Sequence, residues 1–243
     1  MDWSRYNTAI ITRHGIKDLY KNCSKFLEDI PYKKYPLINT SAAGYLESVI
    51  RAKYDWVINI DDDAFLINPK HLYNLMVYMD ENNYDYCGMA DGGFDGCRYT
   101  GNPCSMNPFF NVFNLKSIRE KIDVHIPKFI GIKFEDSLKD LVNYTGFKLP
   151  KERCRYEPDQ EPYYYFFFRL LRDTKPLFLQ AKLYDDNLTT MLYNHNNELL
   201  VYHTWYGRLY NQDEMHKKRI NQVIKLVDDY HNKSHGRLMP PNI

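Results

Sequence analysis

Apolar segments of strand length and helix length alternate through the first ninety residues of the chain. Residues 8–12 form a short β-prone run, and apolar positions across residues 16–30 then recur at the spacing of an amphipathic helix. Residues 35–39 form a second strand-like run, after which Thr40 or Ser41 can cap a helix. This strand–helix–strand–helix order predicts parallel strands that are covered by helices.

The most strongly β-prone segment, residues 56–60 (WVINI), runs directly into three consecutive aspartates at residues 61–63. Pro69 then opens a helix whose apolar side chains are three and four residues apart. Residues 84–90 form a further strand-like run. The pattern therefore places the acidic triplet at the end of a covered strand, which is where open α/β sheets bind ligands.

The second half of the chain has a less regular pattern. Residues 91–108 are rich in Gly, Asn, Asp and Pro and predict a long loop. Further elements are predicted as strands at 109–115, 177–183 and 199–203 and as a helix at 161–172. Because neither a repeat nor a linker divides the chain, we expect a single domain over residues 1–243.

The last predicted element is an amphipathic helix that ends near residue 230. Asn211 fits the first position of a capping box and predicts where this helix starts. Lys217, Lys218 and Arg219 follow in its first turns, and we expect them on a solvated face.

Composition excludes two classes of protein. With 243 residues, 44% of them apolar and 26% charged, the chain is long and apolar enough to fold around a core, so it is not a disordered protein. Its 32 basic and 31 acidic residues nearly cancel. A nucleic-acid partner is therefore not expected, because binding to phosphates needs a surplus of clustered cations.

The five cysteines form no CxxC pair, which argues against a structural zinc site. The N-terminus has no charged-then-apolar signal pattern, and no apolar run approaches the roughly 20 residues of a membrane-spanning helix. We therefore expect a cytoplasmic protein, or one at the cytoplasmic face of a membrane, with no transmembrane segment.

The triplet Asp61, Asp62 and Asp63 calls for an explanation because adjacent carboxylates repel one another. A divalent cation removes this repulsion, and Mg²⁺ and Mn²⁺ prefer carboxylate oxygen ligands. The alternative is a solvated loop in which the aspartates bond to their own backbone. The preceding buried strand and the helix opened by Pro69 favour the metal site.

Residues 52–69 (AKYDWVINIDDDAFLINP) resemble the DXD region of glycosyltransferases that have the GT-A fold and use nucleotide sugars. The strand and helix over residues 9–31 also resemble the opening of that fold. The resemblance implies a GT-A-like (Rossmann-like) α/β fold, a mixed and mostly parallel sheet flanked by helices. It also implies Mn²⁺ or Mg²⁺ as the cofactor.

The resemblance implies roles for particular residues. Asp63 would bind the metal directly, Asp61 would contact the metal or the ribose, and Asp62 would lie near the donor. His203, at the end of a late strand, is the best-placed candidate for the further histidine ligand that many such enzymes have; a strand-end histidine in a hydrogen bond is the alternative.

Arg13 follows the first strand, where GT-A enzymes place the nucleotide, and Arg208 could face the diphosphate. Lys217, Lys218 or Arg219 could also face it, although a solvated helix face is favoured for these three. Asp159 and Glu161 lie just before Pro162, at the start of the helix predicted at 161–172, and resemble the acidic element that serves the acceptor, which makes them the candidate catalytic residues. Helix capping explains them equally simply. The pair at residues 135–136 is a second candidate.

The sequence therefore predicts a metal-dependent glycosyltransferase that moves a sugar from a UDP- or GDP-sugar to a glycan or another hydroxyl acceptor. Residues 8–115 would bind the nucleotide sugar, and residues 116–243 would bind the acceptor and end in the last helix. Two alternatives stay open: a nucleotidyltransferase of sugar metabolism, and a non-catalytic carbohydrate-binding module that holds Ca²⁺.

Overall fold

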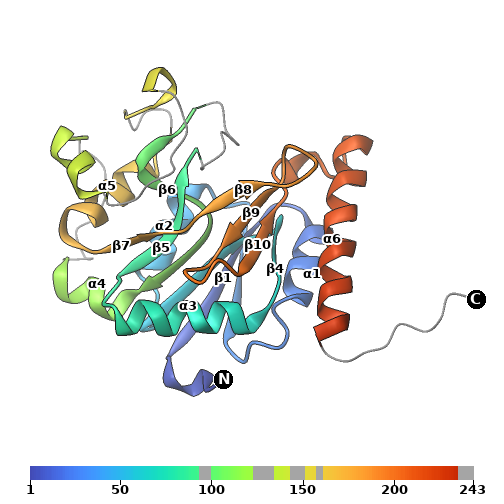
Figure 1. The fold of residues 1–243 in the computed structure, drawn as a ribbon, viewed down its shortest axis with the longest axis horizontal. Coiled ribbons are helices and arrows are strands. Elements are labelled where there is room, and N and C mark those ends of the chain that lie inside the picture. The colour runs from blue at the N-terminus through green and yellow to red at the C-terminus, as the bar shows by residue number, and fades with distance from the viewer. Residues whose placement is uncertain (93–99, 123–133, 143–150, 157–160, 235–243) are drawn as a thin grey trace, which may run out of the picture.

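Two β-sheets and the helices around them make up the computed structural model, which describes residues 1–92, 100–122, 134–142, 151–156 and 161–234 (Figure 1). The larger sheet has the strand order β2 (Lys33–Ile38), β1 (Thr8–His14), β3 (Trp56–Asp61), β6 (Asn102–Asn114), β5 (Tyr86–Asp91) and β7 (Pro176–Phe178). Only β6 runs against the direction of the other strands of this sheet. The smaller, antiparallel sheet has the order β4 (Ala64–Leu66), β10 (Leu199–His203), β9 (Thr190–Tyr193) and β8 (Ala181–Leu183).

Helices cover both faces of the larger sheet. One set packs in a core with the smaller sheet: α1 (Lys17–Lys25), α3 (Pro69–Glu81) and α6 (Glu214–Ser234). The other set packs in a second core: α2 (Ala42–Ile50), α4 (Leu115–Lys121) and α5 (Tyr164–Asp173). Short 3₁₀ turns complete the described elements: η1 (Trp3–Arg5), η2 (Asp136–Leu141), η3 (Lys151–Arg153) and η4 (Gly207–Leu209).

The alternation of side chains along the strands explains the two cores. In β1, Ile10 lies in the core with α1 and Ile11 in the core with α2. In β3, Val57 and Ile58 divide in the same way. Because successive strand residues point to opposite faces, a run that is apolar at every position is buried on both sides.

The predicted fold class is confirmed: the protein is a mixed α/β structure with a mostly parallel sheet flanked by helices. Two predicted helix starts are also confirmed. Ser41 Oγ accepts a hydrogen bond from Gly44 N, and Asn68 Oδ1 accepts one from Lys70 N beside Pro69. No helix in the described part of the chain is long and apolar enough to cross a membrane.

Several predicted boundaries are wrong. The loop predicted over 91–108 ends early, because β6 begins at Asn102 and pairs with β5 through two irregular registers. The strand predicted at 177–183 is two short strands, β7 and β8, in different sheets. Helix α1 ends at Lys25, and the apolar residues that follow it reach the core through tight turns.

The last helix starts two residues later than predicted. Asp213 Oδ1, and not Asn211, accepts the hydrogen bond from an amide of its first turn, His216 N, at 2.9 Å. Strands β4 and β9 and helix α4 were not predicted. Each is too short to show a clear periodic pattern, and the two strands form because β10 lies between them.

Candidate active site

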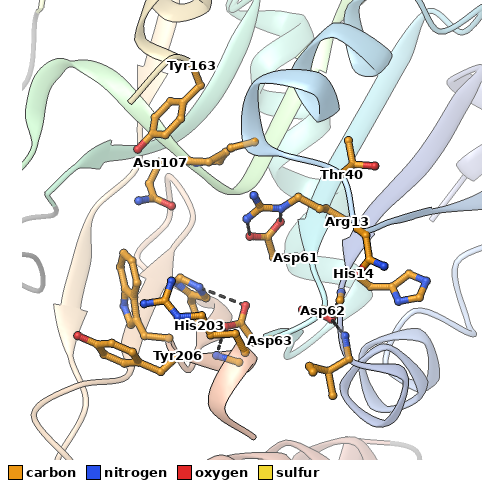
Figure 2. Close-up of a pocket in the computed structure, with 18 of the residues that line it drawn as sticks. Arg13, His14, Thr40, Asp61, Asp62, Asp63, Asn107, Tyr163, His203 and Tyr206 are labelled. Atoms are coloured by element: carbon orange, nitrogen blue, oxygen red, sulfur yellow. Dashed lines mark hydrogen bonds and ion pairs between the residues drawn. The ribbon is translucent and has the colours of Figure 1, made fainter. Parts of the chain in front are cut away.

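A cavity of about 870 Å³ opens at the carboxyl ends of β1 and β3 (Figure 2). Its walls also include the loop after β10 and the segment before α5. The sequence-predicted site residues that line it are Arg13, Asp61, Asp62, Asp63, Glu161, His203 and Arg208. Asp159 lies outside the described residues. The fold therefore brings together residues that are up to 195 positions apart in the chain, from Arg13 to Arg208, in a volume typical of a small-molecule site.

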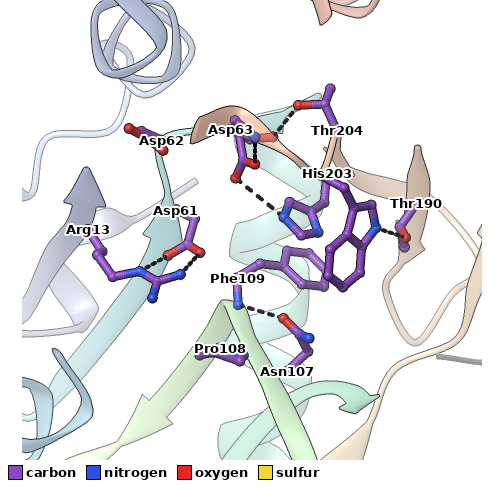
Figure 3. Close-up of polar contacts among 12 residues, drawn as sticks. Arg13, Asp61, Asp62, Asp63, Asn107, Pro108, Phe109, Thr190, His203 and Thr204 are labelled. Atoms are coloured by element: carbon purple, nitrogen blue, oxygen red, sulfur yellow. Dashed lines mark hydrogen bonds and ion pairs between the residues drawn. The ribbon is translucent and has the colours of Figure 1, made fainter. Parts of the chain in front are cut away.

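Arg13 and Asp61 form a two-point ion pair on one wall of the cavity. The parallel register pairs Arg13 with Asp61, so both side chains leave the same face of the sheet. Arg13 Nε donates to Asp61 Oδ1 at 3.0 Å, and Arg13 Nη2 donates to Oδ2 (Figure 3). Burial raises the pKa of Asp61, and the guanidinium charge partly offsets that rise.

Asp62, in the turn after β3, bonds to the turn after β1, and both turns line the cavity. Its Oδ2 accepts hydrogen bonds from Gly15 N at 2.9 Å and Ile16 N at 3.0 Å, just before α1. Burial and the neighbouring Asp63 carboxylate nevertheless raise the pKa of Asp62 to about 7. Asp62 therefore fixes the turn after β1, at an electrostatic cost when it is ionised.

Asp63, in the turn between β3 and β4, faces His203 at the end of β10. Asp63 Oδ1 lies 3.3 Å from His203 Nε2, and its Oδ2 accepts a hydrogen bond from Gly207 N at 3.1 Å (Figure 3). Burial alone would raise the pKa of Asp63, but His203 and the Gly207 amide outweigh it, so the pKa lies below its ordinary value. The carboxylate is therefore ionised and directed at the imidazole.

Aromatic rings fix the orientation of His203. The imidazole stacks on Phe109 with ring centroids 4.2 Å apart and planes 8° apart. Trp205 packs on it at 4.3 Å. His203 Nδ1 is buried and has no hydrogen-bond partner among the described residues. Aromatic contacts, and not a hydrogen-bonded second nitrogen, therefore hold the ring in place.

The turn after β10 carries the opposite wall of the cavity. Trp205 and Tyr206 both adopt left-handed backbone angles, with φ of 55° and 56°. Such angles are uncommon for large side chains and indicate strain. Thr204 anchors the turn by donating from N and Oγ1 to Asp63 O, at 2.9 and 3.0 Å. This turn places Gly207 and Arg208 beside the aspartates.

Glu161 and Tyr163 line the cavity from the segment before α5. The competing acidic pair does not line it. Glu135 pairs with Arg172, and Asp136 pairs with Lys139, both on exposed surface. Of the three described candidate carboxylates for the acceptor, Glu161, Glu135 and Asp136, only Glu161 lines the cavity.

Polar contacts with residues distant in sequence hold Arg219 behind the cavity wall and Asn107 at the cavity. Asn107 lines it and is held by a buried pair: its Nδ2 donates to Asp91 Oδ1 at 2.8 Å, while Tyr164 Oη donates to Asp91 Oδ2 at 2.6 Å. Arg219 was expected on a solvated face, which is wrong: its side chain is 12% exposed and donates to Trp205 O. No short motif marks the role of Arg219, because its partners are far away in sequence.

The side chains at the cavity supply only part of the ligand set that a hard divalent cation needs. No group of three or more His, Cys, Asp and Glu side chains in the described residues could hold a metal ion. Asp63 Oδ1 and His203 Nε2 are 3.3 Å apart, close to the roughly 3 Å between neighbouring ligands that each lie about 2.1 Å from a cation. Two protein ligands suit Mg²⁺ or Mn²⁺ sites in which phosphates and water supply the others.

Comparison with known proteins gives distant similarities only. No family model matches the chain, and no curated protein matches its sequence. A197 from STIV is 12% identical with a TM-score of 0.41, over 80% of this chain and 93% of that one. The mannosyltransferase PcManGT from Pyrobaculum calidifontis, in complex with GDP-Man and Mn²⁺, is 11% identical with a TM-score of 0.38, over 69% and 61%.

TarS 1-349 from S. aureus is 11% identical with a TM-score of 0.35, over 68% of this chain and 64% of that one. The match thus spans less than two thirds of the length of TarS 1-349 and of the mannosyltransferase. With TM-scores below 0.5, none of these similarities fixes the activity of this chain.

Gly207 leaves no room for a larger residue beside Asp63. A Cβ at Gly207 would lie 2.8 Å from Asp63 Cβ and Oδ2. We expect Gly207→Ala to push the carboxylate away and to lower the free energy of unfolding by about 1–3 kcal/mol in urea denaturation. Gly15→Ala is the matched control, because the nearest atom to its Cβ would be 3.9 Å away. Equal stability losses in both variants would contradict this packing.

The raised pKa of Asp62 predicts a pH-dependent stability difference. Asp62 has a pKa of about 7 in the folded protein against an ordinary value of 3.8, so the native state holds this proton more tightly than the unfolded chain does. The contribution of this proton to the stability of the fold is present below about pH 4 and is lost as the pH rises to about 7. Asp62→Asn keeps an acceptor for Gly15 and Ile16 but cannot ionise.

Melting temperatures of wild type and Asp62→Asn in chelator test this. We expect the variant's Tm to exceed that of wild type by a margin that grows from pH 5 to pH 8 and is level above that. A margin independent of pH would contradict the assigned pKa.

Proposed function

We propose that this protein is a metal-dependent glycosyltransferase that moves a sugar from a UDP- or GDP-sugar to a glycan or another hydroxyl acceptor. The observation that carries the proposal is the pairing of Asp63 with His203 in a cavity that also holds the Arg13–Asp61 pair and Glu161. A cation ligand pair, a donor contact and a carboxylate for the acceptor are the groups that this reaction needs.

Asp63 and His203 would hold Mn²⁺ or Mg²⁺. When bound, the cation would act as a Lewis acid that neutralises the diphosphate leaving group. Asp63 lies in the turn between β3 and β4, and His203 ends β10, which pairs with β4, so their alignment depends on how the end of β10 packs against this turn. Asp61 is already bound to Arg13, and its role as a further ligand stays a prediction.

The Arg13–Asp61 pair would orient the donor. Its carboxylate can accept hydrogen bonds from ribose hydroxyls while the guanidinium holds it in place. Arg208 is exposed at the cavity wall and would offer its charge to the diphosphate. Asp62 would hold the turn after β1 in position beside the donor through the hydrogen bonds that it accepts from Gly15 N and Ile16 N.

Glu161 would act on the acceptor. It lies on the segment before α5, which lines the cavity with Tyr163 as well, while β6 lines the cavity with Asn107 and Pro108. A carboxylate there can take the proton of the acceptor hydroxyl as the new bond forms. We assign Asp159 the same function as an alternative. The proposed division into a donor part, 8–115, and an acceptor part, 116–243, then has two exceptions, because His203 would bind the metal and Arg208 would face the diphosphate.

Thermal shift experiments test the proposed function. We expect Mn²⁺ with UDP or GDP to raise the Tm of wild type by several degrees, through binding to the folded state alone. Asp63→Asn should abolish that shift and reduce turnover of the matching nucleotide sugar by at least about 100-fold, since a direct ligand is lost. A Tm rise with Ca²⁺ alone and no nucleotide effect would instead support the carbohydrate-binding module.

Glu161→Gln separates the acceptor from the donor. The variant should bind UDP or GDP with Mn²⁺ as wild type does and should lose about 100-fold or more of kcat with the acceptor, which is the contribution of a general base. Glu135→Gln is the matched control, because Glu135 is an exposed carboxylate paired with Arg172 away from the cavity lining. Unchanged kcat in Glu161→Gln would remove it from the reaction.

A further inference from the structure

Arg219 of α6 lies behind the cavity wall and not in the cavity lining. Its Nη2 donates to Trp205 O at 3.0 Å, and its Nη1 donates to Thr189 Oγ1 at 2.9 Å. Nη1 is also 3.4 Å from Asp186 Oδ2. A guanidinium that is 12% exposed and shared between a helix, a hairpin turn and the turn after β10 ties three segments together.

The counter-ion of Arg219 is itself fixed. Asp186 accepts hydrogen bonds from Leu188 N at 2.9 Å, Thr189 N at 2.7 Å and Thr189 Oγ1 at 2.6 Å. These bonds hold the turn between β8 and β9 in one conformation. Arg219 therefore connects Trp205 to a turn that is itself held by hydrogen bonds, and not to a flexible surface side chain.

The backbone that Arg219 holds is strained. Trp205 and Tyr206 have φ of 55° and 56°, and strained angles in large residues persist only where the surroundings enforce them. The other restraints on this turn are the bond from Trp205 Nε1 to Thr190 Oγ1 at 2.8 Å and the bonds that Thr204 and Gly207 donate to Asp63. Release of Trp205 O would let the turn relax away from Asp63.

We propose that Arg219 is a positioning residue that, through Trp205, holds the turn after β10 so that Asp63 and His203 stay aligned for the cation. The role of the cation in this inference rests on the proposed function, whereas the restraint of the turn by Arg219 follows from the fold alone. Residues that orient metal ligands without touching the metal typically change metal affinity by about 10–100-fold when they are replaced.

The test compares four variants of the full chain. Arg219→Met removes the guanidinium. Arg219→Lys keeps the positive charge but not the planar group that donates to Trp205 O and Thr189 Oγ1 at once. Asp186→Asn removes the counter-ion and leaves α6 unchanged. Asp228→Asn is the matched control, because it breaks an α6 ion pair with Lys25, 2.6 Å long, on α1.

Two measurements are made on each variant. The first is the hydrogen exchange rate of the Thr204 and Gly207 amides, which both donate to Asp63. The second is the Mn²⁺ affinity in the presence of UDP and of GDP, measured from the electron paramagnetic resonance signal of free Mn²⁺. We expect Arg219→Met to exchange faster at both amides and to bind Mn²⁺ about 10-fold more weakly. Arg219→Lys and Asp186→Asn should show smaller effects in the same direction, and Asp228→Asn none.

Unchanged exchange at Thr204 and Gly207 in Arg219→Met would overturn the inference, as would equal effects in Asp228→Asn. Faster exchange with unchanged Mn²⁺ affinity would also overturn it, because the turn would then not align the ligands. If wild type binds no Mn²⁺ with either nucleotide, the proposed function fails. The positioning of a cation then fails with it, and the exchange data still show whether Arg219 braces the turn.

Discussion

The parallel pairing of β1 with β3 is the constraint on which the site depends. It sets Arg13 opposite Asp61 at the last position of the register, so the next two aspartates continue beyond the edge of the sheet. Asp62 accepts a hydrogen bond from the Gly15 amide before α1. Asp63 contacts His203 at the end of β10 and accepts a hydrogen bond from Gly207 N. Each carboxylate of the triplet thus has a different partner, which is how three adjacent like charges are accommodated.

The smaller sheet converts this strand end into a cavity wall. Strand β10 pairs with β4 directly after the triplet, which brings His203 opposite Ala64 and the following turn against Asp63. The stacked Phe109 comes from β6, the one reversed strand of the larger sheet. The imidazole is therefore positioned by contacts to both sheets, and its geometry depends on their packing.

Sequence patterns predicted the parts of the protein in which local preference and tertiary structure agree. Residues 56–60 and Pro69 are examples, because a buried strand and a helix start both have strong local signatures. Asn102 begins a strand although its neighbours favour turns, since pairing with β5 outweighs local preference. Arg219 looked like an exposed helix residue because its partners, Trp205 and Asp186, meet it only in the folded chain.

The central claim is that Asp63 and His203 bind a divalent cation together with a nucleoside diphosphate. Anomalous diffraction from crystals grown with Mn²⁺ and UDP or GDP tests it most directly. We expect a manganese peak within bonding distance of an Asp63 carboxylate oxygen and His203 Nε2, with the diphosphate on its open side. Nucleotide bound in the cavity without a peak there, or a manganese peak elsewhere, would contradict the account.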